Sequence, residues 1–167
     1  MRAVAVAIWT AFSATAALAQ EAVFPFRADT FHVGFNAHAK AENTEREVRW
    51  VGCEKGRPMV CQYRFTSVLL ATVTADEPQA GAKEVVLIYA RPKHRVQAHY
   101  LYSYKIYADL VNVLSPEANE QARGEAMKML LNSIHSAEKE EARVGRVRYT
   151  MDMKRAGVRF VARPLAE

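Results

Sequence analysis

Hydrophobic and polar residues alternate with a helical period over residues 115–140, and this stretch predicts the longest helix of the chain. Advancing about 100° per residue places Met127 and Leu130 on one side of that helix and the polar residues on the other. Ser115 is predicted to be the N-cap because its hydroxyl can accept a bond from a free amide of the first turn. The pattern therefore predicts a helix over about 116–138 with one buried face.

Two further stretches have apolar residues at helical spacing. Residues 105–114 lead directly into the long helix, so the two are predicted to form a bent helix pair. Residues 30–42 form a possible N-terminal helix, although Val33 and Gly34 within them would also suit a strand.

The remaining apolar runs alternate with polar residues or are rich in β-branched and aromatic side chains, which is typical of strands. The predicted strands cover residues 47–53, 59–75, 84–90, 95–104, 146–153 and 158–163. Turn residues separate the first two of these runs, and likewise the last two, which predicts two β-hairpins. Strands on both sides of a helix pair predict an α+β fold, an antiparallel sheet of about five or six strands with the helix pair on one face.

The first twenty residues have the pattern of an export signal. Arg2 precedes an apolar run, and small residues flank Leu18 as a signal peptidase requires. We therefore expect cleavage after Ala19 and a single globular domain over 20–167, located in the periplasm or secreted. The alternative is an uncleaved anchor, but the run is short for a membrane span and no second one follows.

The chain has two cysteines, Cys53 and Cys61, on the two strands of the first predicted hairpin. An even number of cysteines in an exported chain favours a disulfide. If the two residues lie opposite each other, their side chains share a face and can be bridged. We expect a structural disulfide, since their spacing differs from the C-x-x-C of redox proteins.

The formal net charge is +5, and removal of the predicted signal lowers it by one. This mild excess lacks the dense basic footprint of a nucleic-acid binder, and export also argues against that role. The five histidines, at positions 32, 38, 94, 99 and 135, never have the short spacings that commonly build a metal site. No nucleophile motif is present. We therefore predict no catalytic residue, no metal and no cofactor.

Two clusters of side chains remain as candidates for binding. Tyrosines at positions 100, 102 and 104 would share one strand face, as core packing or as an exposed stacking platform. Arginines dominate the last quarter of the chain on the predicted outer face of the second hairpin. That face is either solvated or a docking surface for an acidic protein or an anionic envelope polymer, and the candidate partner-binding residues are Arg146, Arg148, Arg159 and Arg163.

The sequence therefore predicts a small exported protein that binds rather than catalyses, with a protein partner or an anionic envelope component docked on the basic sheet face. An inhibitor, immunity-like or envelope accessory role fits this description. The alternative is a carrier of a small molecule or lipid between sheet and helices, in a pocket lined by Tyr63, Phe65, Tyr100, Tyr102, Met127 and Leu131. A third hypothesis is a hydrolase of unrecognised type. The sequence leaves the oligomeric state open.

Overall fold

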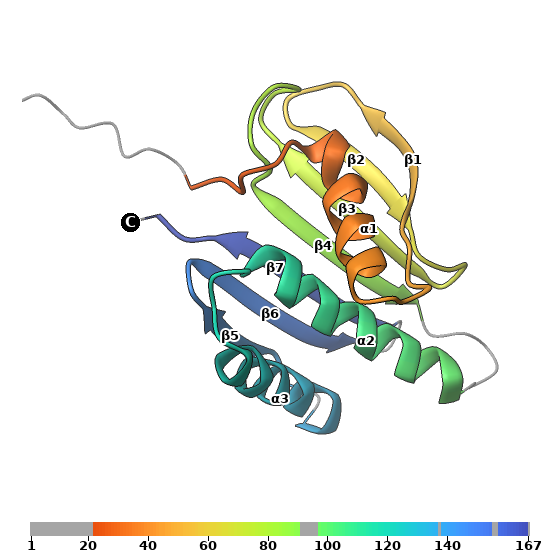
Figure 1. The fold of residues 1–167 in the computed structure, drawn as a ribbon, viewed down its shortest axis with the longest axis vertical. Helices are drawn as coiled ribbons and strands as arrows, with labels where there is room; N and C mark the ends of the chain where they lie inside the picture. Colours follow the sequence, from red (N-terminus) through yellow and green to blue (C-terminus); the bar gives the residue numbers. More distant parts are fainter. Residues whose placement is uncertain (1–21, 91–96, 137, 155–156, 167) are drawn as a thin grey trace, which may run out of the picture.

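The computed structural model describes residues 22–90, 97–136, 138–154 and 157–166, and it forms one antiparallel sheet with helices packed against it (Figure 1). The helices are η1 (Ala28–Thr30), α1 (Phe31–Ala41), α2 (Gln97–Leu114) and α3 (Glu120–Ser136). The strands are β1 (Arg49–Glu54), β2 (Met59–Arg64), β3 (Leu69–Ala75), β4 (Glu84–Ala90), β5 (Glu140–Val144), β6 (Val147–Lys154) and β7 (Gly157–Pro164). The predicted α+β class is confirmed, with seven strands instead of five or six.

The strand order is β1-β2-β3-β4-β7-β6-β5. Strands β1 to β4 follow α1 as one antiparallel meander, and β5 to β7 follow α2 and α3 as another. The two meanders meet where the last strand of each pairs with the other, β4 with β7. This central pair therefore joins the two halves of the sheet.

The core lies between the helices and one face of the sheet. Alternate residues of the strands from β2 to β7 point into it, and the helix period of α1 brings Phe31 and Phe35 onto the same core. From α2, the ring of Tyr107 stacks on Phe160 of β7 with the ring centroids 5.2 Å apart. The predicted N-terminal helix is confirmed as α1, and the predicted alternation of the last hairpin is confirmed by the buried Tyr149, Met151 and Phe160.

The predicted strand over residues 95–104 is wrong, because α2 begins at Gln97 and continues unbroken to Leu114. The buried residues of α2 follow a helical spacing that already includes Ser103, so helix packing outweighs the local alternation of tyrosines. Tyr102 is half-buried and Tyr104 is exposed, so these two do not share a face. The side chain of Tyr100 lies outside the described part of the structure.

Ser115 does not cap a helix, because α3 begins only at Glu120. The side chain of Asn119 accepts a hydrogen bond from the Ala122 amide at 2.8 Å and is the cap instead. Ser115 is buried, and its hydroxyl lies 2.8 Å from the Tyr149 hydroxyl and donates to the Val144 carbonyl at 3.0 Å. Burial raises the pKa of Tyr149 above its ordinary value. Ser115 therefore links the segment between α2 and α3 to the sheet through buried hydrogen bonds.

The sheet has more strands than predicted because one predicted strand is divided in two and because β5 was not predicted. The predicted run 59–75 is divided into β2 and β3 by a turn, in which the Thr66 hydroxyl accepts bonds from the Val68 and Leu69 amides. Three of the five residues of β5 are charged, with Glu141 and Arg143 on its exposed face, so the sequence pattern favoured a solvated helix end there. Its other face buries Ala142 and Val144 against α3.

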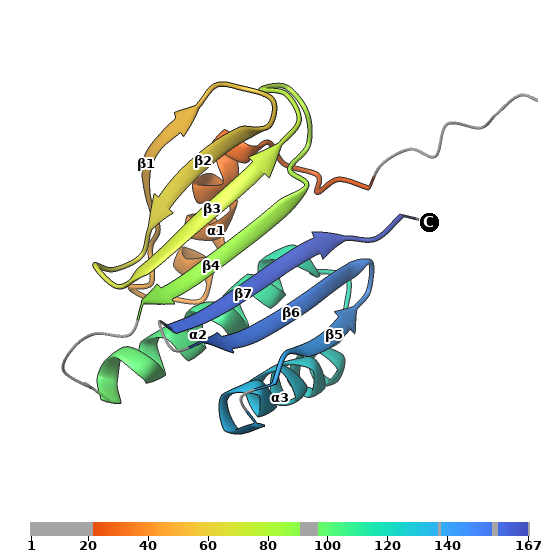
Figure 2. The ribbon, with the colours of Figure 1, turned by 180° about the vertical axis from the view of Figure 1, so that it is seen from behind.

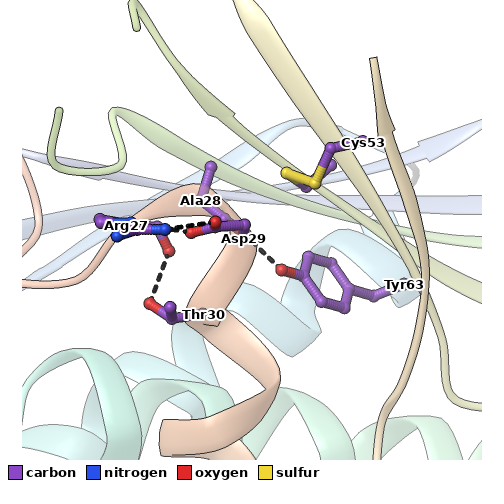
Figure 3. The surroundings of a disulfide bond; sticks show 7 residues. Arg27, Ala28, Asp29, Thr30, Cys53 and Tyr63 are labelled. Carbon is purple, nitrogen blue, oxygen red and sulfur yellow. Dashed lines mark hydrogen bonds and ion pairs between the residues drawn. A yellow bond between two sulfur atoms is a disulfide. The ribbon is translucent and has the colours of Figure 1, made fainter. Parts of the chain in front are cut away.

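The predicted disulfide is confirmed. Cys53 and Cys61 lie directly opposite each other in the β1–β2 register and form a bond with an S–S distance of 2.07 Å. Beside it, the Tyr63 hydroxyl donates a hydrogen bond to the Ala28 carbonyl, as Figure 3 shows. Burial raises the pKa of Tyr63, so the phenol stays protonated and can donate. The disulfide thus holds β1 on β2, and the tyrosine hydroxyl holds β2 on the η1 turn.

The predicted signal peptide, residues 1–19, lies outside the described residues. Of the helices that the structure describes, none combines the length and the apolar character needed to cross a membrane.

Candidate docking surface on the open sheet face

The face of the sheet opposite the core is not covered by α1 or α2. In Figure 2 the strands β2, β3, β4, β7 and β6 lie in front of these helices, so this face of the sheet is towards the viewer. We call this surface the open face. The charged residues of the last hairpin point to it because they alternate with the buried Tyr149, Met151 and Phe160.

Three arginines form a row across three neighbouring strands of the open face. Arg143 of β5 is opposite Arg148 of β6, and Arg148 is opposite Arg163 of β7. We call this row the arginine ladder. Directly opposite residues have their Cβ atoms about 5 Å apart, and like charges at that separation destabilise the sheet. The positive charge is therefore concentrated at a cost in stability.

Two carboxylates partly compensate the arginine ladder. The Arg163 Nε donates to Glu84 Oε2 at 2.5 Å, from the adjacent strand β4. Glu141 Oε1 lies 3.5 Å from the Arg148 Nε and 3.7 Å from the Arg143 Nε. One carboxylate is thus shared between two guanidinium groups, and the ladder keeps a net positive charge.

A shallow depression of about 170 Å³ lies beside the ladder. Its lining contains four basic and two acidic side chains together with two uncharged residues: Lys139, Glu141, Arg148, Thr150, Asp152, Arg159, Val161 and Arg163. Arg159 extends the basic surface towards the centre of the sheet, where it is opposite Asp152. The depression is small and mostly polar, so it suits one acidic side chain better than a whole small molecule.

The centre of the open face is apolar. Two pairs of directly opposite residues form what we call the apolar strip: Leu70 with Ile88, and Val86 with Val161. Leu70 and Ile88 are 43% and 46% exposed, whereas the valines are buried among their neighbours. Arg64 is opposite Leu70 on one side, and Arg159 is opposite Ile88 on the other. An apolar centre with a charged border is the usual anatomy of a protein interface.

The structure brings three of the four predicted partner-binding residues together, namely Arg148, Arg159 and Arg163. Arg146 is separate from them, since it lies in the turn between β5 and β6 and lines a groove at the end of the sheet. Arg143 was not among the predicted partner-binding residues, because β5 was not predicted as a strand. The apolar strip was not predicted either, because it depends on the register between β3, β4 and β7.

The residues predicted to line a pocket between sheet and helices differ in burial. Tyr63 and Met127 are side chains of the packed core, and Phe65 packs edge-on against Phe35. Tyr102 and Leu131 are half-buried. A pocket between sheet and helices stays a prediction.

A groove of about 620 Å³ lies elsewhere, at the end of the sheet where residues 22–26 and 164–166 run past the end of α2. Its walls are largely apolar and include Val23, Phe24 and Leu114, while Arg146 and Glu117 are its charged residues.

Within the described ranges, histidine, cysteine, aspartate and glutamate side chains nowhere gather in a group of three that could hold a metal ion. No protein-family model, no curated protein and no solved structure matches the chain.

Proposed function

We propose that this chain is an exported binding protein of the periplasm or the extracellular space that docks an acidic protein partner on the open face. The arginine ladder is the observation that carries this proposal. Its like charges lower the stability of the sheet in the free protein, and an external carboxylate would remove that repulsion on binding.

The apolar strip favours a protein over an anionic polymer as the partner. A polymer of sugars and phosphates could pair with the guanidinium groups, but it offers little apolar surface to Leu70 and Ile88. A protein segment with acidic residues beside apolar ones matches both parts of the open face. Its apolar side chains would exclude water from the ladder and so strengthen the ion pairs.

Reversing one charge of the ladder tests this proposal. Arg148→Glu places a carboxylate between Arg143 and Arg163, which makes two repulsive cross-strand contacts attractive, but it also puts that carboxylate beside Glu141. These effects oppose each other, so the thermal midpoint should stay close to that of the wild type. Binding of the acidic partner should weaken by about tenfold or more, because the centre of its docking surface now repels it. The measurement is quantitative capture of envelope proteins on immobilised wild-type and variant protein, at low and moderate salt.

Lys128→Glu is the matched control, since it makes the same change of net charge on an exposed position of α3. An acidic protein that is captured by the wild type and by Lys128→Glu, but not by Arg148→Glu, supports the proposal. Equal capture by all three proteins would refute it. Loss of capture at moderate salt is expected from screening of exposed charges.

A carrier function is the second candidate, and the end groove is the observation that favours it. Its volume is within the range of small-molecule sites, and its walls are mainly apolar. Native mass spectrometry of freshly purified protein should then show a bound molecule, which Val23→Trp should displace because Val23 forms an exposed part of the wall. Repeated preparations with only the mass of the unliganded chain would count against this function.

A further inference from the structure

Strand β1 is the free edge of the sheet on the side opposite β5. It pairs with β2 on one side, and no segment of the described chain pairs with its other side. The amide and carbonyl groups on that side are therefore available to another strand. Natural proteins usually protect such an edge with proline, with lysine or with a covering loop.

The composition of β1 protects its edge poorly. The strand has neither proline nor lysine, and Trp50 and Val51 in its first half are 55% and 50% exposed. Its only charged residues are at its two ends, Arg49 and Glu54, and they have opposite signs. In the part of the chain that the structure describes, neither has an ion-pair partner, and Arg49 is opposite another arginine, Arg64.

A bulge in β1 places these two charges on the same face. The pairing with β2 shifts between Trp50 and Gly52. Arg49 is opposite Arg64, and Glu54 is opposite Val60, so both point to the open face although five positions separate them. In a regular strand, residues five positions apart would point to opposite faces.

We propose that β1 pairs antiparallel with β1 of a second copy of this chain, about a twofold axis perpendicular to the sheet. When this axis passes between Val51 and Gly52, Arg49 lies opposite Glu54 of the second copy, and Glu54 lies opposite its Arg49. On the core side of the sheet, Trp50 lies opposite Cys53 of the second copy. Each strand thus supplies the charge that the other lacks, and the edge backbone groups on either side of the bulge gain partners.

Self-complementarity identifies the occupant of this edge. An unrelated extended segment would need a basic and an acidic residue at this spacing in reverse order, whereas a second copy has them by symmetry. Because each copy has only one β1, the contact is isologous and stops at two chains. The disulfide from Cys53 to Cys61 holds β1 on β2, so the edge strand is already ordered for pairing.

The twofold axis also fixes how the open faces are arranged. Since it is perpendicular to the sheet, both open faces point the same way and form one continuous fourteen-stranded surface. The dimer forms whether or not a partner binds to these faces.

Charge reversal at the two ends of β1 tests the dimer by sedimentation velocity of the purified protein with its disulfide formed. The wild type should show a concentration-dependent equilibrium between monomer and dimer. Arg49→Glu and Glu54→Arg should each raise the dissociation constant about tenfold or more, because each creates two symmetric like-charge contacts. The double variant R49E/E54R should restore the wild-type constant.

A mixture of the two single variants provides the decisive result. Each variant alone repels its own copies, but together they are complementary, so the mixture should form a heterodimer. Arg49→Glu also removes the repulsion with Arg64 within the chain, so its thermal midpoint should not fall and unfolding cannot explain a lost dimer.

Three results would overturn the proposal. The first is a wild type that sediments as a single chain up to hundreds of micromolar. The second is single variants that dimerise as well as the wild type, which would assign the dimer to another surface. The third is a mixture of the single variants that fails to pair.

Discussion

Replacing Gly157 by alanine should destabilise the protein by about 3 kcal/mol or more, because the added methyl group has no room. Gly157 begins β7 with a φ of +150°, a conformation that residues with a Cβ rarely adopt. A Cβ there would lie 1.8 Å from the Tyr89 carbonyl oxygen and 3.2 Å from the Ala90 Cα of β4. Both are backbone atoms, so they can move only if the β4–β7 pairing opens.

The measurement is the free energy of unfolding from urea denaturation. Gly34→Ala is the matched control, since it makes the same substitution on an exposed position of α1 where no atom lies within 4 Å of the new Cβ. That variant should be more stable than the wild type by about 0.5–1 kcal/mol, through helix propensity. Equal stabilities of the wild type and Gly157→Ala would show that the junction of the two meanders has spare room.

The fold class could be predicted because its evidence is local. Alternation along β6 is clear, β7 departs from it mainly at the buried Val161, and α1 has apolar residues at four-residue spacing, so burial of one face determined the type of each element. The first hairpin was predicted from the turn residues between two strand-like runs, and its register, with Cys53 opposite Cys61, is the one that the predicted disulfide requires.

The errors arose where tertiary packing decides between two local patterns. The tyrosines at 100, 102 and 104 alternate like a strand, but Ser103, Ile106 and Tyr107 are buried at helical spacing in α2. Strand β5 is short and highly charged, and it is stabilised by its pairing with β6 and its packing on α3. Neither partner can be seen within the local sequence.

The candidate docking surface was predictable only where its residues are close in the sequence. Arg148, Arg159 and Arg163 belong to a single hairpin, so alternation placed them on one face. Arg143 was left out of the predicted site because β5 was not predicted as a strand. Arg146 was included, but the turn at Gly145 takes it out of the strand. The apolar strip joins residues more than 70 positions apart, and only the register of the sheet brings them together.

Removing the carboxylate of Asp109 should destabilise the protein by about 2–3 kcal/mol, less than for a fully buried ion pair because Arg46 is partly exposed. Arg46, in the segment before β1, contacts Asp109 of α2 through two bonds, Nε to Oδ2 at 2.5 Å and Nη2 to Oδ1 at 3.0 Å. The two side chains are 20% and 8% exposed. The hydrogen bond to Asp109 raises the pKa of Arg46 further, so in Asp109→Ala the arginine stays charged without its partner.

The cost arises from the unpaired charge rather than from the lost attraction, and two further variants separate these causes. R46M/D109L removes both charges and keeps most of the side-chain volume, so it should be more stable than Asp109→Ala. Asp109→Asn keeps one acceptor for the guanidinium and should fall between the wild type and Asp109→Ala. If R46M/D109L instead lost more stability than Asp109→Ala, the attraction itself would be the larger contribution, and the ion pair would hold the segment before β1 on α2.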